Sequence, residues 1–208
     1  MLWALFNDIA QRVITLDKYE QRNNLSLRLR KIGLPPSSKV LDFGCGTGLF
    51  ARVFVKAGFL YLGFDIDDRL IDYASNLYRN CQFTSSTRTL EKQAPFDLIL
   101  ANCCFHHIND TSLPLELERI ECLLAENGFF LAIDLLKVGE SHSLLHRLFM
   151  MMEQGAYLRT SDGYKKHIER FFKIRNIDIE RLYVFGLRHR LNPLYNDLAV
   201  FECTRKES

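Results

Sequence analysis

The chain has 208 residues, of which 48% are hydrophobic and 25% are charged, and its formal net charge is +2 at pH 7. These values are ordinary for one globular domain and exclude a disordered chain, and so weak a net charge argues against a nucleic-acid partner. No uninterrupted apolar run approaches the roughly 20 residues of a transmembrane helix, so we expect no membrane span.

The first 136 residues alternate short apolar runs with amphipathic segments. Apolar residues recur at helical spacing within 2–16, and no basic region precedes them as it does in a secretory signal, so the chain is expected to begin with a helix. The predicted strands are 39–43, 60–65, 81–84, 96–102 and 129–136, and the predicted helices between them are 48–58, 67–78 and 112–128, the last ended by Asn-Gly. This alternation is typical of a parallel sheet covered on both faces, so the fold class is α/β.

The rhythm changes after residue 137. Two helical segments are predicted at about 141–155 and 161–171. Two strands follow at 177–185 and 198–204, joined by a short loop that contains proline, as in a hairpin. The sheet is therefore expected to end in an antiparallel pair.

A glycine-rich loop follows the first predicted strand. The stretch VLDFGCGTG places Gly44, Gly46 and Gly48 between a strand and a helix. Such a loop lets a ligand approach the backbone closely and directs free N–H groups toward it. The fingerprint G-x-G-x-x-G would need glycine at 49, where the chain has Leu49, and the Gly-Lys-Ser/Thr of a P-loop is absent.

Two acids accompany this loop. Asp65 ends the second predicted strand, where an acid of a doubly wound fold accepts hydrogen bonds from a ribose diol. Asp42 lies at the end of the first strand, where a carboxylate would meet a ligand's ammonium group. The alternative for Asp65 is an exposed helix cap, and the glycine loop at this spacing favours ligand binding over capping.

Four motifs in register resemble the class I S-adenosylmethionine-dependent methyltransferases, in particular the small-molecule branch similar to the ubiquinone and menaquinone biosynthesis methyltransferases (type 11). They are VLDFGCGTG, GFDID, FDLILANCCFHHI and LLAENGFFLAIDLL. The resemblance covers residues 38 to 136. It implies a Rossmann-like, doubly wound, seven-stranded sheet, mostly parallel with an antiparallel final strand, and S-adenosylmethionine as cofactor, with S-adenosylhomocysteine as product.

The resemblance also assigns site residues. Asp65 would bind the ribose hydroxyls and Ile66 would pack on the adenine. Asn102 and Cys103 would border the methionine end of the cofactor. The methionine half would be cradled by Asp42, Gly44, Cys45, Gly46 and Gly48.

The third motif departs from the family pattern. Family members usually have an acid after strand three near the adenine amine, and this chain has only hydroxyls in that stretch. A hydroxyl accepts that hydrogen bond more weakly than a carboxylate. We expect Ser85 or Ser86 to take this place, or backbone groups and apolar packing to hold the adenine.

The stretch NCCFHH admits three interpretations. Zinc would suit Cys103, Cys104, His106 and His107 chemically, but neighbouring strand side chains point to opposite faces and no second pair completes four ligands, so no metal is predicted. The Asn-Pro-Pro-Tyr/Phe motif of amide and amine methyltransferases would need prolines where both cysteines stand. The third interpretation places His106 and His107 in the acceptor pocket, where a histidine titrating near neutrality takes a proton during methyl transfer.

The acceptor side is expected in residues 137–172. Tyr157, Arg159 and Tyr164 are the candidate substrate residues, Arg159 as the partner of an anionic group. We predict a single domain, 1–208, composed of an N-terminal helical segment (1–37), a cofactor-binding core (38–136), a helical acceptor-side insertion (137–172) and a terminal strand pair (173–208).

The predicted function is methyl transfer to a small, partly apolar molecule. The alternatives are a nucleic-acid or protein N-methyltransferase and a cofactor-binding protein without turnover. Six cysteines without a Cys-x-x-Cys pair indicate reduced thiols and a cytoplasmic location. No oligomeric state follows from the sequence.

Overall fold

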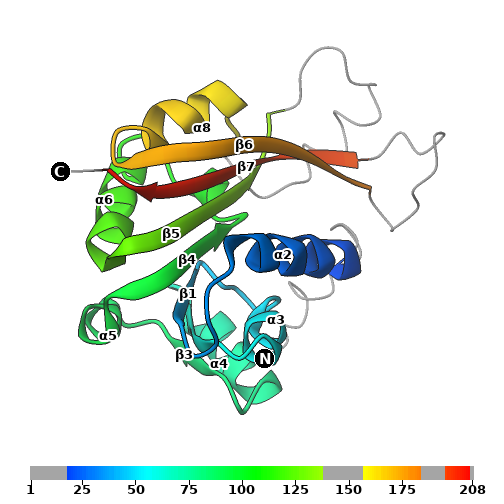
Figure 1. Ribbon diagram of the computed structural model, residues 1–208, viewed down its shortest axis with the longest axis vertical. Helices are drawn as coiled ribbons and strands as arrows, with labels where there is room; N and C mark the ends of the chain where they lie inside the picture. The colour runs from blue at the N-terminus through cyan, green and yellow to red at the C-terminus, as the bar shows by residue number, and fades with distance from the viewer. Residues whose placement is uncertain (1–17, 138–156, 184–194, 207–208) are drawn as a thin grey trace.

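A seven-stranded sheet organises the protein, as the computed structural model shows (Figure 1). The structure describes residues 18–137, 157–183 and 195–206. The strands are β1 (Lys39–Phe43), β2 (Leu60–Phe64), β3 (Gln82–Thr84), β4 (Phe96–Asn102), β5 (Leu124–Leu135), β6 (Phe172–Tyr183) and β7 (Tyr195–Arg205). The helices are α2 (Lys18–Ile32), α3 (Ala51–Lys56), α4 (Asp68–Leu77), α5 (Thr87–Gln93), α6 (Leu113–Leu123) and α8 (Ser161–Ile168), with a 3-10 turn η1 (Phe105–His107).

The strand order is β3-β2-β1-β4-β5-β7-β6. The first five strands run parallel, and β7 is antiparallel to both of its neighbours. This confirms the predicted doubly wound, mostly parallel sheet with an antiparallel final strand. Because β1 and β4 are adjacent and parallel, the segments that follow them meet at the carboxyl edge of the sheet, where such folds bind ligands.

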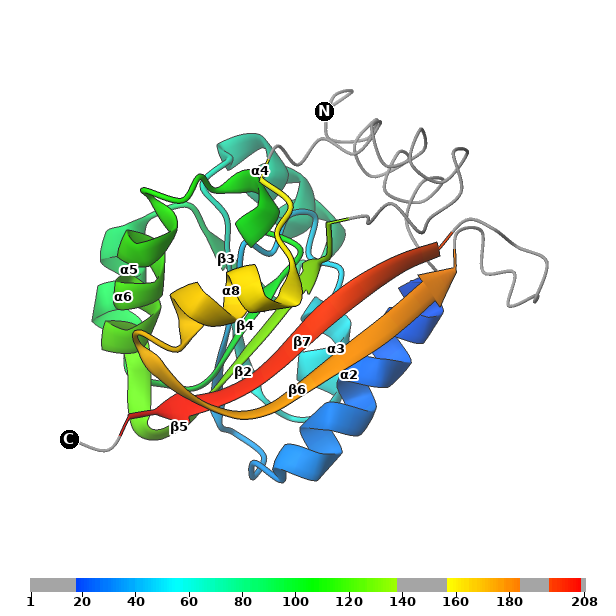
Figure 2. The ribbon, with the colours of Figure 1, turned by 90° about the horizontal axis from the view of Figure 1, so that it is seen from above.

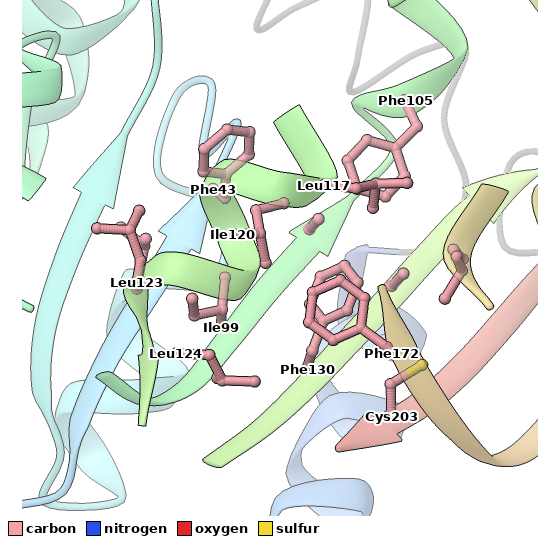
Figure 3. Packing of buried hydrophobic residues seen from close by; sticks show 14 of the residues in the cluster. Phe43, Ile99, Phe105, Leu117, Ile120, Leu123, Leu124, Phe130, Phe172 and Cys203 are labelled. Atoms are coloured by element: carbon pink, nitrogen blue, oxygen red, sulfur yellow. The ribbon is translucent and has the colours of Figure 1, made fainter. Parts of the chain in front are cut away.

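Apolar residues alternate between the two faces along each strand, so each face has its own core. On one face, Leu98 and Leu100 of β4 pack with α2 and α3. On the other, Ile99 and Ala101 pack with α6, α8 and η1. Figure 2 shows these helices on opposite sides of the sheet, and Figure 3 shows the second cluster around Phe130 and Phe172.

Several element boundaries differ from the predictions, and the largest shifts lie at the starts of β5 and β6. The helix predicted at 112–128 ends at Leu123, and β5 begins at Leu124 instead of 129, because buried Leu124 pairs with Phe96 across a bulge. Similarly, β6 begins at Phe172 instead of 177, where a buried ring pairs with Arg205. In both cases burial and strand pairing overrode the local pattern. Helix α5 was not predicted, since it is short and polar.

Two predicted helices, 2–16 and 141–155, lie outside the described residues. Helix α2 falls within the segment 1–37 that was predicted to be helical. In the part of the chain that the structure covers, no helix has the length and apolar character needed to cross a bilayer.

Candidate functional site

The glycine loop after β1 is fixed to the end of β2. The N–H groups of Gly44 and Cys45 both donate to the carbonyl of Phe64, at 2.8 and 2.9 Å. Gly44 has φ +75°, and a Cβ there would lie 2.6 Å from the Cβ of Cys104. Gly46 and Gly48 also have positive φ. The loop therefore needs glycine at 44 for its backbone conformation and for its contact with the segment after β4.

Asp65 connects this loop to the turn after β2. Its Oδ2 accepts from the N–H of Gly46 at 2.9 Å, and its Oδ1 accepts from the N–H of Asp67 at 3.0 Å. Burial raises the pKa of Asp65, and the backbone N–H groups of Asp67, Gly46 and Ile66 oppose that rise. A carboxylate has about four acceptor positions, so acceptor capacity remains for a ligand. The adjacent Ile66 is 88% exposed, an apolar side chain open to solvent beside the carboxylate.

Asp42 lies beneath the loop and is 1% exposed. The Tyr61 hydroxyl donates to its Oδ2 at 3.0 Å. Burial raises the pKa of Asp42 to about 7, the hydrogen bond from Tyr61 lowers it, and the nearby Asp65 raises it further. Within the described parts of the chain no cation contacts this carboxyl group, so a ligand's positive charge would be a new and favourable neighbour.

The end of β3 reaches the same edge, since the N–H of Asp65 donates to the carbonyl of Thr84. The Thr84 hydroxyl accepts from the N–H of Ser86 at 3.1 Å. Ser86 precedes α5, and its side chain makes no capping hydrogen bond. Ser85 is half-buried beside it. Both serines thus lie near Asp65 and Ile66, on the side of the site where an adenine acceptor was expected.

The segment after β4 turns sharply at Cys103, which has φ +51° and donates its N–H to the carbonyl of Ile133 at 2.7 Å. Proline is restricted to φ near −65°, so this backbone is incompatible with the Asn-Pro-Pro motif. Cys103 packs with the α2 and α3 core and Cys104 with the opposite core, so their thiols diverge. Asn102 lines a narrow cavity against α2. Across the described residues, no three side chains of His, Cys, Asp or Glu gather as metal ligands.

The two histidines have different environments. His106 is 2% exposed, and its Nδ1 lies 2.5 Å from Oδ1 of Asp134. Oδ2 of Asp134 also accepts from the N–H of Phe105 at 2.7 Å. His107 is exposed at the carboxyl edge, and its ring centroid lies 4.1 Å from that of His106. Its pKa is lowered to about 4, mainly by desolvation and to a smaller extent by the neighbouring His106. His107 is therefore neutral at physiological pH and accessible, whereas His106 is enclosed.

The structure gives Arg159 a different role from the predicted contact with an acceptor anion. Its side chain is 8% exposed, and every guanidinium N–H faces a protein acceptor. These acceptors are the carbonyls of Phe105, Tyr157 and Ile108 and the carboxylate of Asp110. Arg159 thus holds the segment that carries the histidines, and no donor remains for an acceptor molecule.

The two tyrosines also differ. Tyr164 is fully buried and donates its hydroxyl to the carbonyl of Leu135 at 3.1 Å, so it belongs to the core and the expected substrate contact is corrected. Tyr157 is 42% exposed, and its N–H donates to the carbonyl of His106 at 3.0 Å. Of the three predicted acceptor residues, Tyr157 alone presents its side chain to solvent beside the histidines.

Asp134 was not among the predicted site residues, and the contacts of Arg159 with loop carbonyls were not predicted. A signal for Asp134 was present, because an acid in the apolar run FFLAIDLL must find partners if that run is buried. Arg159 carried no comparable signal, since the carbonyls that it binds become neighbours only in the folded chain.

A sequence family described as "Methyltransferase domain" matches residues 16–178. An uncharacterized methyltransferase of Schizosaccharomyces pombe is 27% identical over 122 residues, which cover 51% of this chain and 42% of that protein. A putative methyltransferase of Geobacillus is 28% identical over 111 residues, 50% of this chain and 45% of that protein. The chain thus spans less than half the length of these curated relatives.

Solved structures share the fold at low sequence identity. The cyclopropane synthase MmaA2 of Mycobacterium tuberculosis superposes with a TM-score of 0.67 at 15% identity, covering 89% of this chain and 84% of that one. At 15% identity this match shows a common fold.

Proposed function

The chain belongs to the S-adenosylmethionine-dependent methyltransferase family, whose cofactor is S-adenosylmethionine, and we propose that it transfers a methyl group to a small, partly apolar molecule. The proposal rests mainly on the hydrogen bond between the glycine loop and the carboxylate of Asp65. Main-chain N–H groups of the loop and of the turn after β2 fix this carboxylate, and exposed Ile66 lies beside it. A ribose diol and an adenine face fit this arrangement.

Each part of the cofactor has proposed partners along the carboxyl edge. Asp65 would accept hydrogen bonds from the ribose, Ile66 would pack on the adenine, and Ser85 or Ser86 would accept from its amine. The methionine half would lie over the glycine loop, against Asp42, Gly44, Cys45, Gly46, Gly48, Asn102 and Cys103. When bound, S-adenosylmethionine supplies an activated methyl group on a sulfonium. The buried, uncompensated carboxyl of Asp42 fits a cationic amino acid group.

His107 is the proposed histidine of the acceptor pocket. It is exposed and neutral near pH 7, so its ring is able to accept a hydrogen bond from the hydroxyl of a phenol or enol, and its pKa of about 4 makes it a weaker base than a histidine that titrates near neutrality. His106 is a positioning residue, because its pairing with Asp134 fixes the backbone on which His107 stands. Orientation contributes much of the acceleration when a methyl donor is already activated, so loss of the base would slow the reaction without abolishing it.

A small acceptor is preferred to a nucleic acid or protein for two reasons. The net charge of +2 provides no strongly basic surface, and the backbone at Cys103 excludes the proline motif used for amide and amine groups. The six cysteines are free of disulfides, which supports a reducing compartment and hence the cytoplasm. The acceptor-side segment 137–172 is proposed to complete the pocket.

The direct test is methyl transfer from S-adenosylmethionine labelled in the methyl group. The protein would be incubated with small phenols, carboxylic acids and amines, and in parallel with RNA and protein. We expect label in a small-molecule class, a reduced rate with His107→Ala, and less label with Asp65→Ala at a limiting cofactor concentration. Label only in RNA or protein would refute the small-molecule assignment, and bound cofactor without transfer to any acceptor would indicate a protein without turnover.

A further inference from the structure

Asn196, near the start of β7, has a buried side chain with an unpaired oxygen. The residue is 2% exposed, and its Oδ1 has no hydrogen-bond partner in the described parts of the chain. Burying such an oxygen is costly, because the hydrogen bond to water that it loses is not replaced. Most buried polar atoms in folded proteins have partners, so an unpaired one calls for an explanation. A ligand that donates a hydrogen bond would provide the missing partner.

Asn196 lies at the same edge of the sheet as the two histidines. Since β7 runs antiparallel to β5, its first residues adjoin the end of β5, where Leu198 pairs with Leu135. The preceding residue of β5, Asp134, binds the turn that carries the histidines. The unpaired oxygen therefore belongs to the carboxyl edge, where the proposed methyl transfer takes place.

The side chain of Asn196 is on the face of the sheet that α2 covers. Leu198 packs in the core beneath α2, whereas Ala199 packs in the core on the opposite face. Alternation along the strand places Asn196 on the same face as Leu198. Its register partner on β6, Leu182, also belongs to the core beneath α2. Figure 2 shows α2 alongside β6 and β7.

A narrow cavity lies between α2 and this face of the sheet. Its walls include Leu182 and Leu198, which are the cross-strand partner of Asn196 and its second neighbour along β7. The walls also include Ile133 of β5 and Asn102 at the end of β4. The cavity thus joins the surroundings of Asn196 to the end of β4, the proposed border of the cofactor.

The charged groups in the walls of this cavity already have partners. Glu180 accepts from the Nδ2 of Asn24 at 3.1 Å and from the Nε of Arg28 at 3.0 Å. These groups are satisfied within the protein, in contrast to the Oδ1 of Asn196. The remaining walls are mostly apolar, so the cavity combines apolar contact with one unpaired oxygen beside it.

We propose that Asn196 selects the methyl acceptor, its Oδ1 accepting a hydrogen bond from a hydroxyl or N–H group of a small, largely apolar molecule. The inference rests on the proposed function and defines the chemical class of its substrate more closely. Leu182 and Leu198 contact the apolar body of that molecule. A site with a buried hydrogen-bonding group rejects an analogue without the matching hydrogen far more strongly than an apolar wall discriminates one methylene.

The test compares the binding of phenol and toluene, which are similar in shape and differ in the hydroxyl group. NMR titration in the presence of saturating S-adenosylhomocysteine gives the ratio of the toluene dissociation constant to that of phenol. We expect Asn196→Leu to lower this ratio at least about tenfold, because the hydroxyl loses its partner. Asn176→Leu is the matched control on the same hairpin. It replaces a half-buried asparagine whose Nδ2 donates to Asp178 at 3.0 Å, and it should leave the ratio within about twofold.

An unchanged ratio in Asn196→Leu would overturn the inference, since the oxygen would then serve only water or the fold. The wild-type protein provides a measurement that does not depend on folding of the variant. The side-chain amide signal of Asn196 should shift on addition of phenol and stay in place with toluene, and no shift with phenol, or equal shifts with both, would also overturn the inference. Failure of folded wild-type protein to bind S-adenosylhomocysteine would instead refute the proposed function.

Discussion

Replacing Asp42 by asparagine should remove the part of the free energy of unfolding that wild type loses as pH rises from 4 to 7. In the folded protein the pKa of Asp42 is about 7, mainly because of burial, against an ordinary value of 3.8. Between these values the unfolded chain has released the proton that the folded chain retains, so the free energy of unfolding falls as pH rises. A difference of about three pKa units corresponds to about 4 kcal/mol, complete near pH 7.

Urea unfolding of wild type and Asp42→Asn between pH 4 and 8 measures this contribution. The variant should gain stability relative to wild type as pH rises, approaching about 4 kcal/mol above pH 7. Asp72→Asn, an exposed position on α4 with the same change of charge, should show no such trend. A stability difference between wild type and Asp42→Asn that is constant across this pH range would refute the reasoning.

Three further predictions concern the loop, the Arg159 contacts and the histidine. Gly44→Ala should lower the free energy of unfolding by more than Gly46→Ala. Both glycines have positive φ, but only at position 44 would the added Cβ clash, because it would lie 2.6 Å from the Cβ of Cys104. Thermal unfolding of the two variants measures the difference, and equal losses of stability would contradict the close contact. Arg159→Gln should lower the free energy of unfolding in urea by about 2–3 kcal/mol, because several buried carbonyls lose a charged donor. Asp110→Asn changes an exposed partner of Arg159 and should lower it by less than about 1 kcal/mol. Similar losses for the two variants would argue against the Arg159 contacts. His107 should titrate near pH 4 in NMR spectra, and a midpoint near 6.5 would show that it is fully hydrated.

The sheet and the cofactor side of the site were predictable because their signals are local. Alternating apolar strands and helices indicated the parallel order, and the confirmed antiparallel end followed from the hairpin pattern. The spacing of the glycines and Asp65 indicated a loop and an acid at one edge of the sheet. The structure brings them into direct hydrogen-bond contact, a detail that spacing alone does not provide.

The acceptor side was less predictable because its contacts join distant parts of the chain. Adjacent His106 and His107 look equivalent in sequence, and the carboxylate of Asp134, 28 residues away, distinguishes the enclosed one. Arg159 and Tyr164 were predicted to line the acceptor pocket because of their residue types. In the fold, the guanidinium of Arg159 is bound by loop carbonyls, and Tyr164 is buried in the core.

The central claim is that the glycine loop and Asp65 form a cofactor site, and calorimetric titration with S-adenosylhomocysteine tests it most directly. The wild-type protein should bind one equivalent, and Asp65→Ala should bind at least about tenfold more weakly, since it removes the acceptor for the ribose and the fixed partner of the loop. Absence of binding by folded wild-type protein, or equal binding by Asp65→Ala, would contradict the account.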